Sequence, residues 1–249
     1  MAEACAVLGT GCRELPPRDG EVALEFWVAP SEAAAAHAAL SALGRVDAPE
    51  REDPAWQEAM RAFHRPVRVG DALLVRPPWT DPEPGLLDVV IDPGMAFGTG
   101  QHDTTRGCLE LMLGLPRGPL VDVGTGSGVL AIAARRLGFD PVWAFDHDPF
   151  AVEATIENAR VNGVGLTVAC RDLTRDRLPQ APVMIANLTC EVLLLLARAI
   201  ADAPPQHAVL SGLRPFEVPR VLETFAPLGL AERDRREGAE WASVLLGRA

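Results

Sequence analysis

The clearest pattern along the chain is the regular alternation, from residue 101 onward, of short apolar runs with longer amphipathic stretches. Short apolar runs are typical of buried strands, and apolar residues that recur every three to four positions are typical of helices. The pattern predicts helices at 101–114, 129–137, 149–162, 190–201 and 215–225, and strands at 120–123, 142–146, 166–170, 183–187 and 208–211. Such alternation predicts a doubly wound α/β fold, in which ligands bind at the carboxyl ends of the parallel strands.

The end of the chain follows a different pattern. Two β-like runs, Leu228–Arg235 and Glu240–Leu246, are separated by Glu237-Gly238, with no helical stretch between them. Strands joined by a short turn pair in an antiparallel manner. We therefore expect a Rossmann-like α/β fold with a mostly parallel seven-stranded sheet and a C-terminal antiparallel hairpin.

The first third of the chain predicts separate, smaller elements. Two β-like runs, Cys5–Leu15 and Glu21–Ala29, flank a turn-rich Pro16–Gly20 segment, and Ser31 can cap a helix that runs to Leu43. These elements predict a partial α+β unit at 1–48, because two strands and one helix are too few to close a stable domain. A short helix starting near Pro54 predicts a helical linker at 49–67. The main domain then spans 68–249 and begins with β-like runs at 72–76 and 87–91.

A glycine-rich turn follows the first strand of the main domain, within Leu120-Val-Asp-Val-Gly-Thr-Gly-Ser-Gly128. Glycines allow a backbone to approach a ligand closely, and the helix that follows offers free N–H groups. We expect Gly124 and Gly126 to contact a cofactor. Asp146 ends the next strand, about 20 residues on, where a carboxylate can bind ribose hydroxyls.

The spacing within this turn distinguishes between two classes of nucleotide cofactor. Dinucleotide enzymes carry Gly-x-Gly-x-x-Gly, whereas this chain carries Gly-x-Gly-x-Gly with Val129 at the third dinucleotide position. Asp122 lies two residues before the first glycine, and a carboxylate suits a cationic ligand better than a pyrophosphate. S-adenosylmethionine carries both an ammonium and a sulfonium group, so the pattern favours a methyltransferase.

Composition excludes several other classes of function. The formal net charge is −11, and an acidic protein repels phosphate backbones, so we expect no direct nucleic-acid substrate and favour a basic protein or a small cation. The 23 basic residues are all arginine, which excludes lysine chemistry. The five cysteines form no Cys-x-x-Cys pair and the histidines show no metal-ligand spacing. No apolar run is long enough for a membrane span, and the N-terminus does not read as a secretory signal, so we expect a cytoplasmic, monomeric protein without membrane contacts.

Two further segments indicate which class of methyltransferase the chain resembles. They are Asp92-Pro-Gly-Met-Ala-Phe-Gly-Thr-Gly-Gln-His-Asp-Thr-Thr105 and Ile185-Ala-Asn-Leu188. Together with the glycine turn and Phe145-Asp-His-Asp-Pro149, they resemble the bacterial methyltransferases of ribosomal large-subunit protein eleven. The resemblance covers roughly residues 54–249. It implies a class I methyltransferase fold for 68–249, S-adenosylmethionine as cofactor, and methylation of lysine or N-terminal amines of a basic ribosomal protein.

The resemblance also implies roles for individual residues. Cofactor contacts are expected at Thr105, Gly124, Asp146 and Asn187, with Thr104 as a rival for the contact of Thr105. Asn187 is also the expected amine-positioning residue. It precedes Leu188-Thr189 rather than Pro-Pro-aromatic, which argues against a planar amide or base nitrogen as the target. For His102 we expect an ordering role in its loop rather than a catalytic one.

The N-terminal region departs from the family pattern. Family members carry a complete ferredoxin-like recognition domain, whereas residues 1–48 give no pattern for the first strand and first helix of that unit. Either the start codon lies further upstream, which we favour, or part of the recognition surface has been lost. Besides a ribosomal protein, two alternatives stay open: another protein lysine or a small molecule as substrate, and a non-catalytic cofactor-binding module.

Overall fold

The computed structural model describes residues 12–18, 21–26, 28, 32–48, 63–93 and 100–248. The chain divides into two compact units, residues 1–60 and 61–249, and each is considered by itself. The expected helix near Pro54 and most of the first expected strand lie outside the described residues. No helix in the described ranges is long and apolar enough to span a membrane.

The first unit contains a two-stranded antiparallel sheet and one helix. Strand β1 (Cys12–Arg18) pairs with β2 (Glu21–Phe26), and helix α2 (Ala33–Ser41) follows. The prediction that the turn begins at Pro16 was wrong, because β1 continues through Pro16 and Pro17. The register shifts between Leu15 and Arg18. Prolines lack an N–H group and are tolerated in strands at such irregularities and at edges.

The second unit begins with a small sheet. Strand β4 (Leu73–Arg76) lies between β3 (Val67–Val69), which is antiparallel to it, and β5 (Leu87–Val90), which is parallel. Strand β3 was not predicted, because three residues are too short to show a period. The half-buried Arg76 binds Asp88 with two hydrogen bonds of 2.6 and 2.7 Å and so ties β4 to β5.

The main sheet has seven strands in the order β11-β12-β10-β9-β6-β7-β8. Five of them run parallel, and β12 and β11 add an antiparallel pair beside β10. This arrangement confirms the predicted α/β fold, including its C-terminal hairpin. The strands are β6 (Leu120–Val123), β7 (Val142–Asp146), β8 (Thr167–Cys170), β9 (Val183–Asn187), β10 (His207–Leu213), β11 (Leu230–Glu237) and β12 (Ala242–Arg248).

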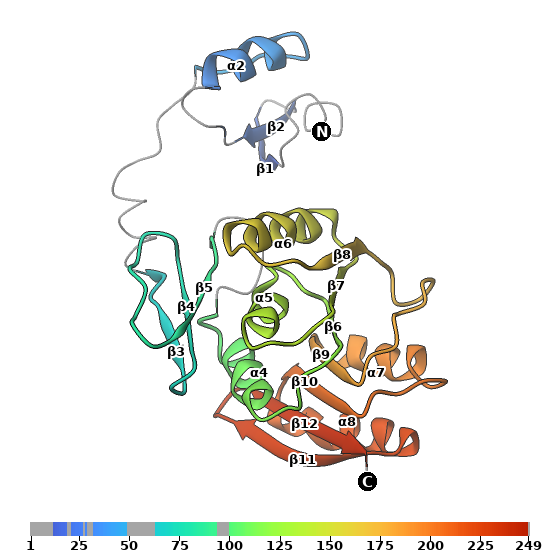
Figure 1. The fold of residues 1–249 in the computed structure, drawn as a ribbon. Coiled ribbons are helices and arrows are strands. Elements are labelled where there is room, and N and C mark those ends of the chain that lie inside the picture. Colours follow the sequence, from blue (N-terminus) through green and yellow to red (C-terminus); the bar gives the residue numbers. More distant parts are fainter. Residues whose placement is uncertain are drawn as a thin grey trace. The chain divides into compact units, whose positions relative to one another are not determined.

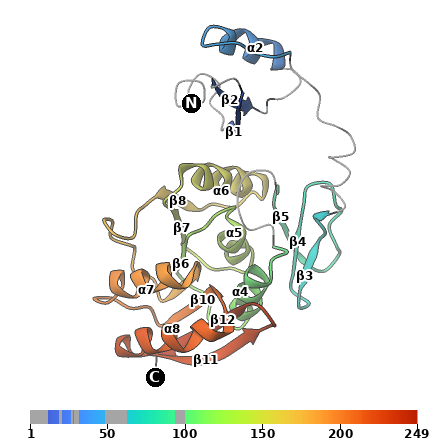
Figure 2. The same cartoon turned by 180° about the vertical axis from the view of Figure 1, so that it is seen from behind.

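Helices cover both faces of this sheet, as Figures 1 and 2 show from opposite sides. Apolar residues alternate along the strands: Val183 and Ile185 face one core, and Met184 and Ala186 face the other. The first core includes helices α4 (Asp103–Leu113), α5 (Val129–Arg136) and α6 (Pro149–Val161), and the second includes α7 (Cys190–Ala199) and α8 (Val218–Phe225). Short 3₁₀ turns, Pro215–Glu217 and Ala226–Leu228, flank α8.

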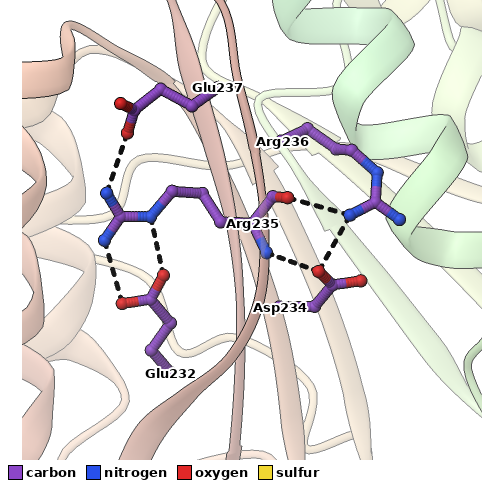
Figure 3. Close-up of polar contacts among 5 residues, drawn as sticks. All are labelled: Glu232, Asp234, Arg235, Arg236 and Glu237. Carbon is purple, nitrogen blue, oxygen red and sulfur yellow. Dashed lines mark hydrogen bonds and ion pairs between the residues drawn. The ribbon is translucent and has the colours of Figure 1, made fainter.

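Strand β11 forms one edge of the sheet and carries a run of ion pairs (Figure 3). Arg235 binds Glu232 at 2.7 and 2.9 Å and Glu237 at 2.8 Å. Arg236 binds Asp234 at 2.8 Å and also reaches Glu110 of α4 at 3.3 Å. The edge strand is therefore covered by paired charges, a common device against strand-to-strand association.

Candidate functional site

The candidate site lies where the strand order of the main sheet reverses. Strands β7 and β8 continue to one side of β6, whereas β9 and β10 lie on the other side. Val123 pairs with Ala186 and Asn187 pairs with Ser211, so the turn after β6 and the ends of β9 and β10 share one edge. In open α/β sheets, ligands bind in the crevice at such a reversal point.

The glycine turn adopts a backbone that other residues rarely reach. Gly124, Gly126 and Gly128 all have positive φ angles, of 75°, 56° and 83°. The N–H groups of Gly124 and Thr125 donate to the carbonyl of Phe145 at 2.8 and 2.9 Å, which fixes the turn against β7. The expectation that glycines are needed here therefore has a geometric basis.

Leu188 lies against two glycines, Gly124 of the turn and Gly212 of β10. A Cβ added to Gly124 would lie 2.3 Å from Cδ2 of Leu188, and one added to Gly212 would lie 2.3 Å from the carbonyl oxygen of Leu188. Leu188 also donates its N–H to Ser211 at 3.0 Å. The chain after Asn187 thus passes closely between two glycines and forms part of the site.

Asp122 is a fully buried carboxyl behind the turn. Its Oδ2 accepts a 2.9 Å hydrogen bond from the hydroxyl of Thr125, whereas Oδ1 completes no hydrogen bond among the described residues. The nearby backbone N–H of Ala131 favours the charged form of this carboxyl, although it forms no hydrogen bond with Oδ1. Burial, aided by the charge of Asp146, raises the pKa of Asp122 to about 7.

Asp146 ends β7 with its carboxylate held in place by backbone groups. Oδ2 accepts the N–H of Gly126 at 3.0 Å, and Oδ1 accepts the N–H of Asp148 at 3.1 Å. The ring of His147 approaches Oδ1 to 3.3 Å but is itself largely exposed. Each carboxylate oxygen retains a further lone pair, so Asp146 can accept hydroxyl donors from a ligand.

A cavity of about 240 Å³ opens beside Asp146 and Gly124. Its apolar lining comes from the loop after β8, from the residue after β9 and from helix α7, and consists mainly of Leu173, Leu178, Leu188, Val192 and Leu195. The charged part of the lining includes the carboxylates of Asp146 and Asp172 and the guanidinium of Arg171. An apolar lining beside a carboxylate suits a purine nucleoside, with the purine against the leucines and the sugar at Asp146.

The structure brings Asn187 together with both threonines named from the sequence. Its Nδ2 donates to Oγ1 of Thr104 at 3.2 Å and to Oγ1 of Thr105 at 3.4 Å. Both threonines are buried in the first turn of α4. The amide group is thereby fixed with its NH₂ toward α4, which leaves its carbonyl oxygen as the acceptor that a ligand can use.

His102 orders the start of α4. Its Nδ1 lies 2.8 Å from Oγ1 of Thr104, and it caps the helix through the N–H of Thr104. Its ring packs edge-on against Trp241 with 5.1 Å between ring centroids. These contacts support the ordering role expected for His102. Residues 94–99 of the same motif lie outside the described residues.

Reasoning from the sequence missed a buried hydroxyl pair behind Thr104. The hydroxyls of Ser211 and Ser243 lie 2.6 Å apart, and that of Ser211 donates to the carbonyl of Thr104 at 3.1 Å. A Cβ on Gly107 would lie 2.3 Å from Oγ of Ser243, so α4 approaches the sheet very closely here. Three distant segments meet at this point, and no local pattern marks any of them.

Comparison with known families decides the classification. A family model described as "Ribosomal protein L11 methyltransferase (PrmA)" matches residues 27–248. The chain belongs to this family.

Relatives named ribosomal protein L11 methyltransferase agree with this assignment. The protein of Symbiobacterium thermophilum is 39% identical over 213 residues, which are 82% of this chain and 70% of that protein. That of Geobacter metallireducens is 39% identical over 195 residues, 76% of this chain and 65% of that protein. The matched part of the chain thus spans about two thirds of the length of these relatives.

Solved structures show the same fold. The ribosomal protein L11 methylase of Lactobacillus delbrueckii subsp. bulgaricus aligns with a TM-score of 0.68 and 27% identity, over 75% of this chain and 99% of that one. A tRNA (uracil-54, C5)-methyltransferase of Pyrococcus abyssi aligns with a TM-score of 0.55 and 15% identity, over 74% of this chain and 44% of that one. The second likeness shows the fold alone.

The family uses S-adenosylmethionine, and the residues of the site fit that cofactor. The unsatisfied Oδ1 of Asp122 offers an acceptor to a cation. Gly124 carries no side chain where it lines the cavity, and the apolar side chains beside Asp146 suit an adenosine.

Proposed function

We propose that this protein transfers methyl groups from S-adenosylmethionine to amino groups of ribosomal protein L11. The observation that carries the proposal is the convergence at one sheet edge of the glycine turn, the carboxylate of Asp146 and the amide of Asn187. The glycine turn and Asp146 support a nucleoside site. The amide of Asn187 supports an acceptor for the amine at the end of the adjacent strand, β9.

The proposed cofactor contacts follow the chemistry of each group. Asp146 accepts the ribose hydroxyls, and Leu173 and Leu188 cover the purine. The open backbone at Gly124 and Gly126 receives the methionine end, with Asp122 as the nearby anion and Thr105 as a hydroxyl at the start of α4. When bound, the cofactor supplies an electrophilic sulfonium methyl group, so little acid–base chemistry is required of the protein.

Asn187 orients the attacking amine in this proposal. A lysine amine has a reference pKa near 10.4, and only its neutral form attacks, so its proton must first leave. A water-poor site lowers the pKa of an amine. The carbonyl oxygen of Asn187 then accepts a remaining N–H and turns the lone pair toward the cofactor, while Thr104 and Thr105 hold the amide in place.

Replacing Asn187 by alanine tests this role. It removes the acceptor but leaves the glycine turn and Asp146 intact, so we expect turnover to fall by about 100-fold, a typical cost of lost positioning. Cofactor affinity should change by only about twofold. Single-turnover kinetics with a binding titration measures both quantities, and unchanged turnover would remove Asn187 from the mechanism.

Charge favours a basic protein as the substrate. The chain carries a formal net charge of −11, and opposite charge speeds association with a basic ribosomal protein. We infer that residues 1–48 form part of a ferredoxin-like recognition unit, 49–67 a helical linker and 68–249 the methyltransferase domain. We place the protein in the cytoplasm, where ribosomal proteins are made. We also infer that it is a monomer.

The test is a methylation assay with purified ribosomal protein L11. Because this chain contains no lysine, label found on lysine cannot come from methylation of the enzyme itself. We expect methyl groups from labelled cofactor to appear on lysine or N-terminal amines of L11, located by mass spectrometry. Absence of label on L11, with label on another protein of a cytosolic panel, would contradict the proposed substrate.

A further inference from the structure

A line of hydrogen bonds leads from the imidazole of His102 to the amide of Asn187. Nδ1 of His102 lies 2.8 Å from Oγ1 of Thr104, and the same oxygen accepts a 3.2 Å bond from Nδ2 of Asn187. Thr104 is only 2% exposed, so its hydroxyl must find its partners inside the protein. A hydroxyl has a single hydrogen, and the neighbour that receives this hydrogen decides what the other neighbour can do.

The cap of helix α4 fixes the direction of the first bond in this line. Nδ1 of His102 accepts the backbone N–H of Thr104 at 3.4 Å. A ring nitrogen that accepts a hydrogen bond carries no hydrogen of its own. The hydroxyl of Thr104 must therefore be the donor in the 2.8 Å contact with Nδ1. Its hydrogen is directed to His102, and only its lone pairs remain for Asn187.

This direction leaves one favourable orientation for the amide of Asn187. Its Nδ2 can donate to the lone pairs of Thr104, whereas an amide turned over would place Oδ1 against them with no hydrogen between the two oxygens. Oγ1 of Thr105 also accepts Nδ2, at 3.4 Å, and favours the same orientation. The carbonyl oxygen of Asn187 is then left to accept an N–H from the substrate amine.

Contacts at both ends hold the line in place. The ring of Trp241 packs edge-on against the imidazole of His102, with 5.1 Å between ring centroids, and the guanidinium of Arg214 lies 4.2 Å above the centre of Trp241. The hydroxyl of Ser211 donates to the backbone carbonyl of Thr104 at 3.1 Å. The imidazole and the threonine are therefore each fixed by a second part of the fold.

We propose that His102 is a positioning residue that sets the orientation of the Asn187 amide through the hydroxyl of Thr104. This inference rests on the proposed function, and it requires more of His102 than a helix cap: the neutral ring must carry its hydrogen on Nε2. Without an acceptor at Nδ1, the hydroxyl hydrogen of Thr104 is free to bond the carbonyl oxygen of Asn187. The amide then populates both orientations, and one of them presents its NH₂ group to the amine instead of an acceptor.

The first test needs neither cofactor nor substrate. Nuclear magnetic resonance of labelled histidine nitrogens in the intact chain reports which ring nitrogen carries hydrogen. The chain has five histidines, and the signals of His102 are those that His102→Asn lacks. We expect an unprotonated Nδ1 and a protonated Nε2 at neutral pH. Hydrogen on Nδ1 would overturn the inference.

The second test is kinetic. His102→Leu keeps a side chain of moderate size but removes the acceptor, so we expect turnover to fall by about tenfold, a part of the full cost of lost positioning, with cofactor affinity kept within about twofold. His102→Asn retains an acceptor near the place of Nδ1 and is a favoured helix cap, so it should restore most of the turnover. In a Thr104→Val chain the line is already cut, so His102→Leu should add no further loss.

A matched control acts at the other end of the same helix. Arg117 donates to the carbonyls of Leu113 and Leu137 at 3.2 and 2.9 Å, where α4 ends. Arg117→Met should lower the melting temperature and leave turnover unchanged. If His102 only stabilised α4, His102→Leu would behave in the same way.

The kinetic results that would overturn the inference are a His102→Leu variant with normal turnover, a His102→Asn variant as slow as His102→Leu, and losses that multiply when His102→Leu and Thr104→Val are combined. If the intact chain transfers no methyl group to L11 although Nδ1 of His102 is unprotonated, the proposed function fails. That outcome differs from each of the others.

Discussion

Asp122 can bind a cationic ligand, but burial of its charge is unfavourable in the ligand-free protein. Its carboxyl is buried beneath the turn with one oxygen unsatisfied, and its pKa is raised to about 7 because burial penalises the charge. A carboxylic acid at this position is uncharged in mildly acidic solution. A cationic ligand favours the ionised form, so ligand binding and proton release are linked.

This linkage predicts a pH dependence of cofactor affinity. The free protein holds the proton of Asp122 below pH 7 and loses it above, and the cofactor binds the ionised form more tightly. The affinity for S-adenosylmethionine should therefore rise by up to about tenfold per pH unit between pH 5.5 and about 7 and then level off. Calorimetry in buffers of different ionisation heat should detect proton release at pH 6 and much less at pH 8.

Asp122→Asn is the matched control, since it mimics the neutral carboxyl. Its affinity should be lower and should not follow the titration. For the unfolded chain the pKa is the ordinary 3.8, so the folded protein binds the proton more tightly between 3.8 and about 7. The stability gained from this group is complete below pH 3.8 and is lost as the pH rises through about 7. Proton uptake on binding would contradict this account.

Gly124 provides a second prediction at the scale of one residue. Gly124→Ala places a Cβ 2.3 Å from Leu188 in a backbone with φ of 75°, and Leu188 lines the cavity. We expect cofactor affinity to fall by about tenfold, because strain of about 1 kcal/mol is added to a displaced cavity wall. Gly114→Ala is the control: its φ is −83° and its Cβ would meet nothing within 4 Å. Equal binding titrations for the two variants would refute the reasoning.

Site residues that belong to a local sequence motif could be named from the sequence. Residues whose role depends on contacts with distant segments could not. Gly124 and Asp146 follow predicted strands, so their meeting at one edge could be expected. The choice between Thr104 and Thr105 stayed open in the sequence, and Asn187 reaches both. Ser211 looks like an ordinary strand residue until its bond to Thr104, in a distant segment, is known.

At the scale of elements, buried strands were the best predicted. Strands β6, β7 and β9 have the boundaries expected, because β7 and β9 are apolar runs that end in a polar residue and β6 ends at the glycine turn. Strand β10 extends past its expected end at Ser211 to Leu213, since it pairs with β12 through a register shift. Pairing of this kind depends on a distant strand and is not visible in the local sequence.

The charged edge strand yields a prediction at this scale. Replacing both Glu232 and Arg235 by valine removes ion pairs that each contribute less than about 1 kcal/mol, so folding should survive. It also replaces two of the six charged side chains of β11 by β-branched apolar ones, which should favour association with other copies. Sedimentation should show concentration-dependent self-association. The same double change at Glu157 and Arg160, a pair on helix α6, should not produce it. A monomeric β11 variant would argue against edge protection.

At the scale of the whole molecule, all the residues proposed to hold the cofactor belong to the larger unit, residues 61–249. The matched part of the chain spans about two thirds of the length of its relatives.

 The family match over residues 27–248 includes every one of these cofactor residues. Cofactor binding is therefore the property that the chain should display by itself, whichever protein it recognises.

The most direct test of the central claim is a calorimetric titration of the full chain with S-adenosylhomocysteine. We predict saturable binding of one equivalent, with loss of at least about tenfold in affinity in Asp146→Ala, because the carboxylate that receives the ribose is removed. Asp140→Ala, a change in a carboxylate that binds Arg135 on the surface, should bind like the intact chain. No binding to the intact chain, or equal binding to the Asp146→Ala variant, would contradict a nucleoside site at this edge of the sheet.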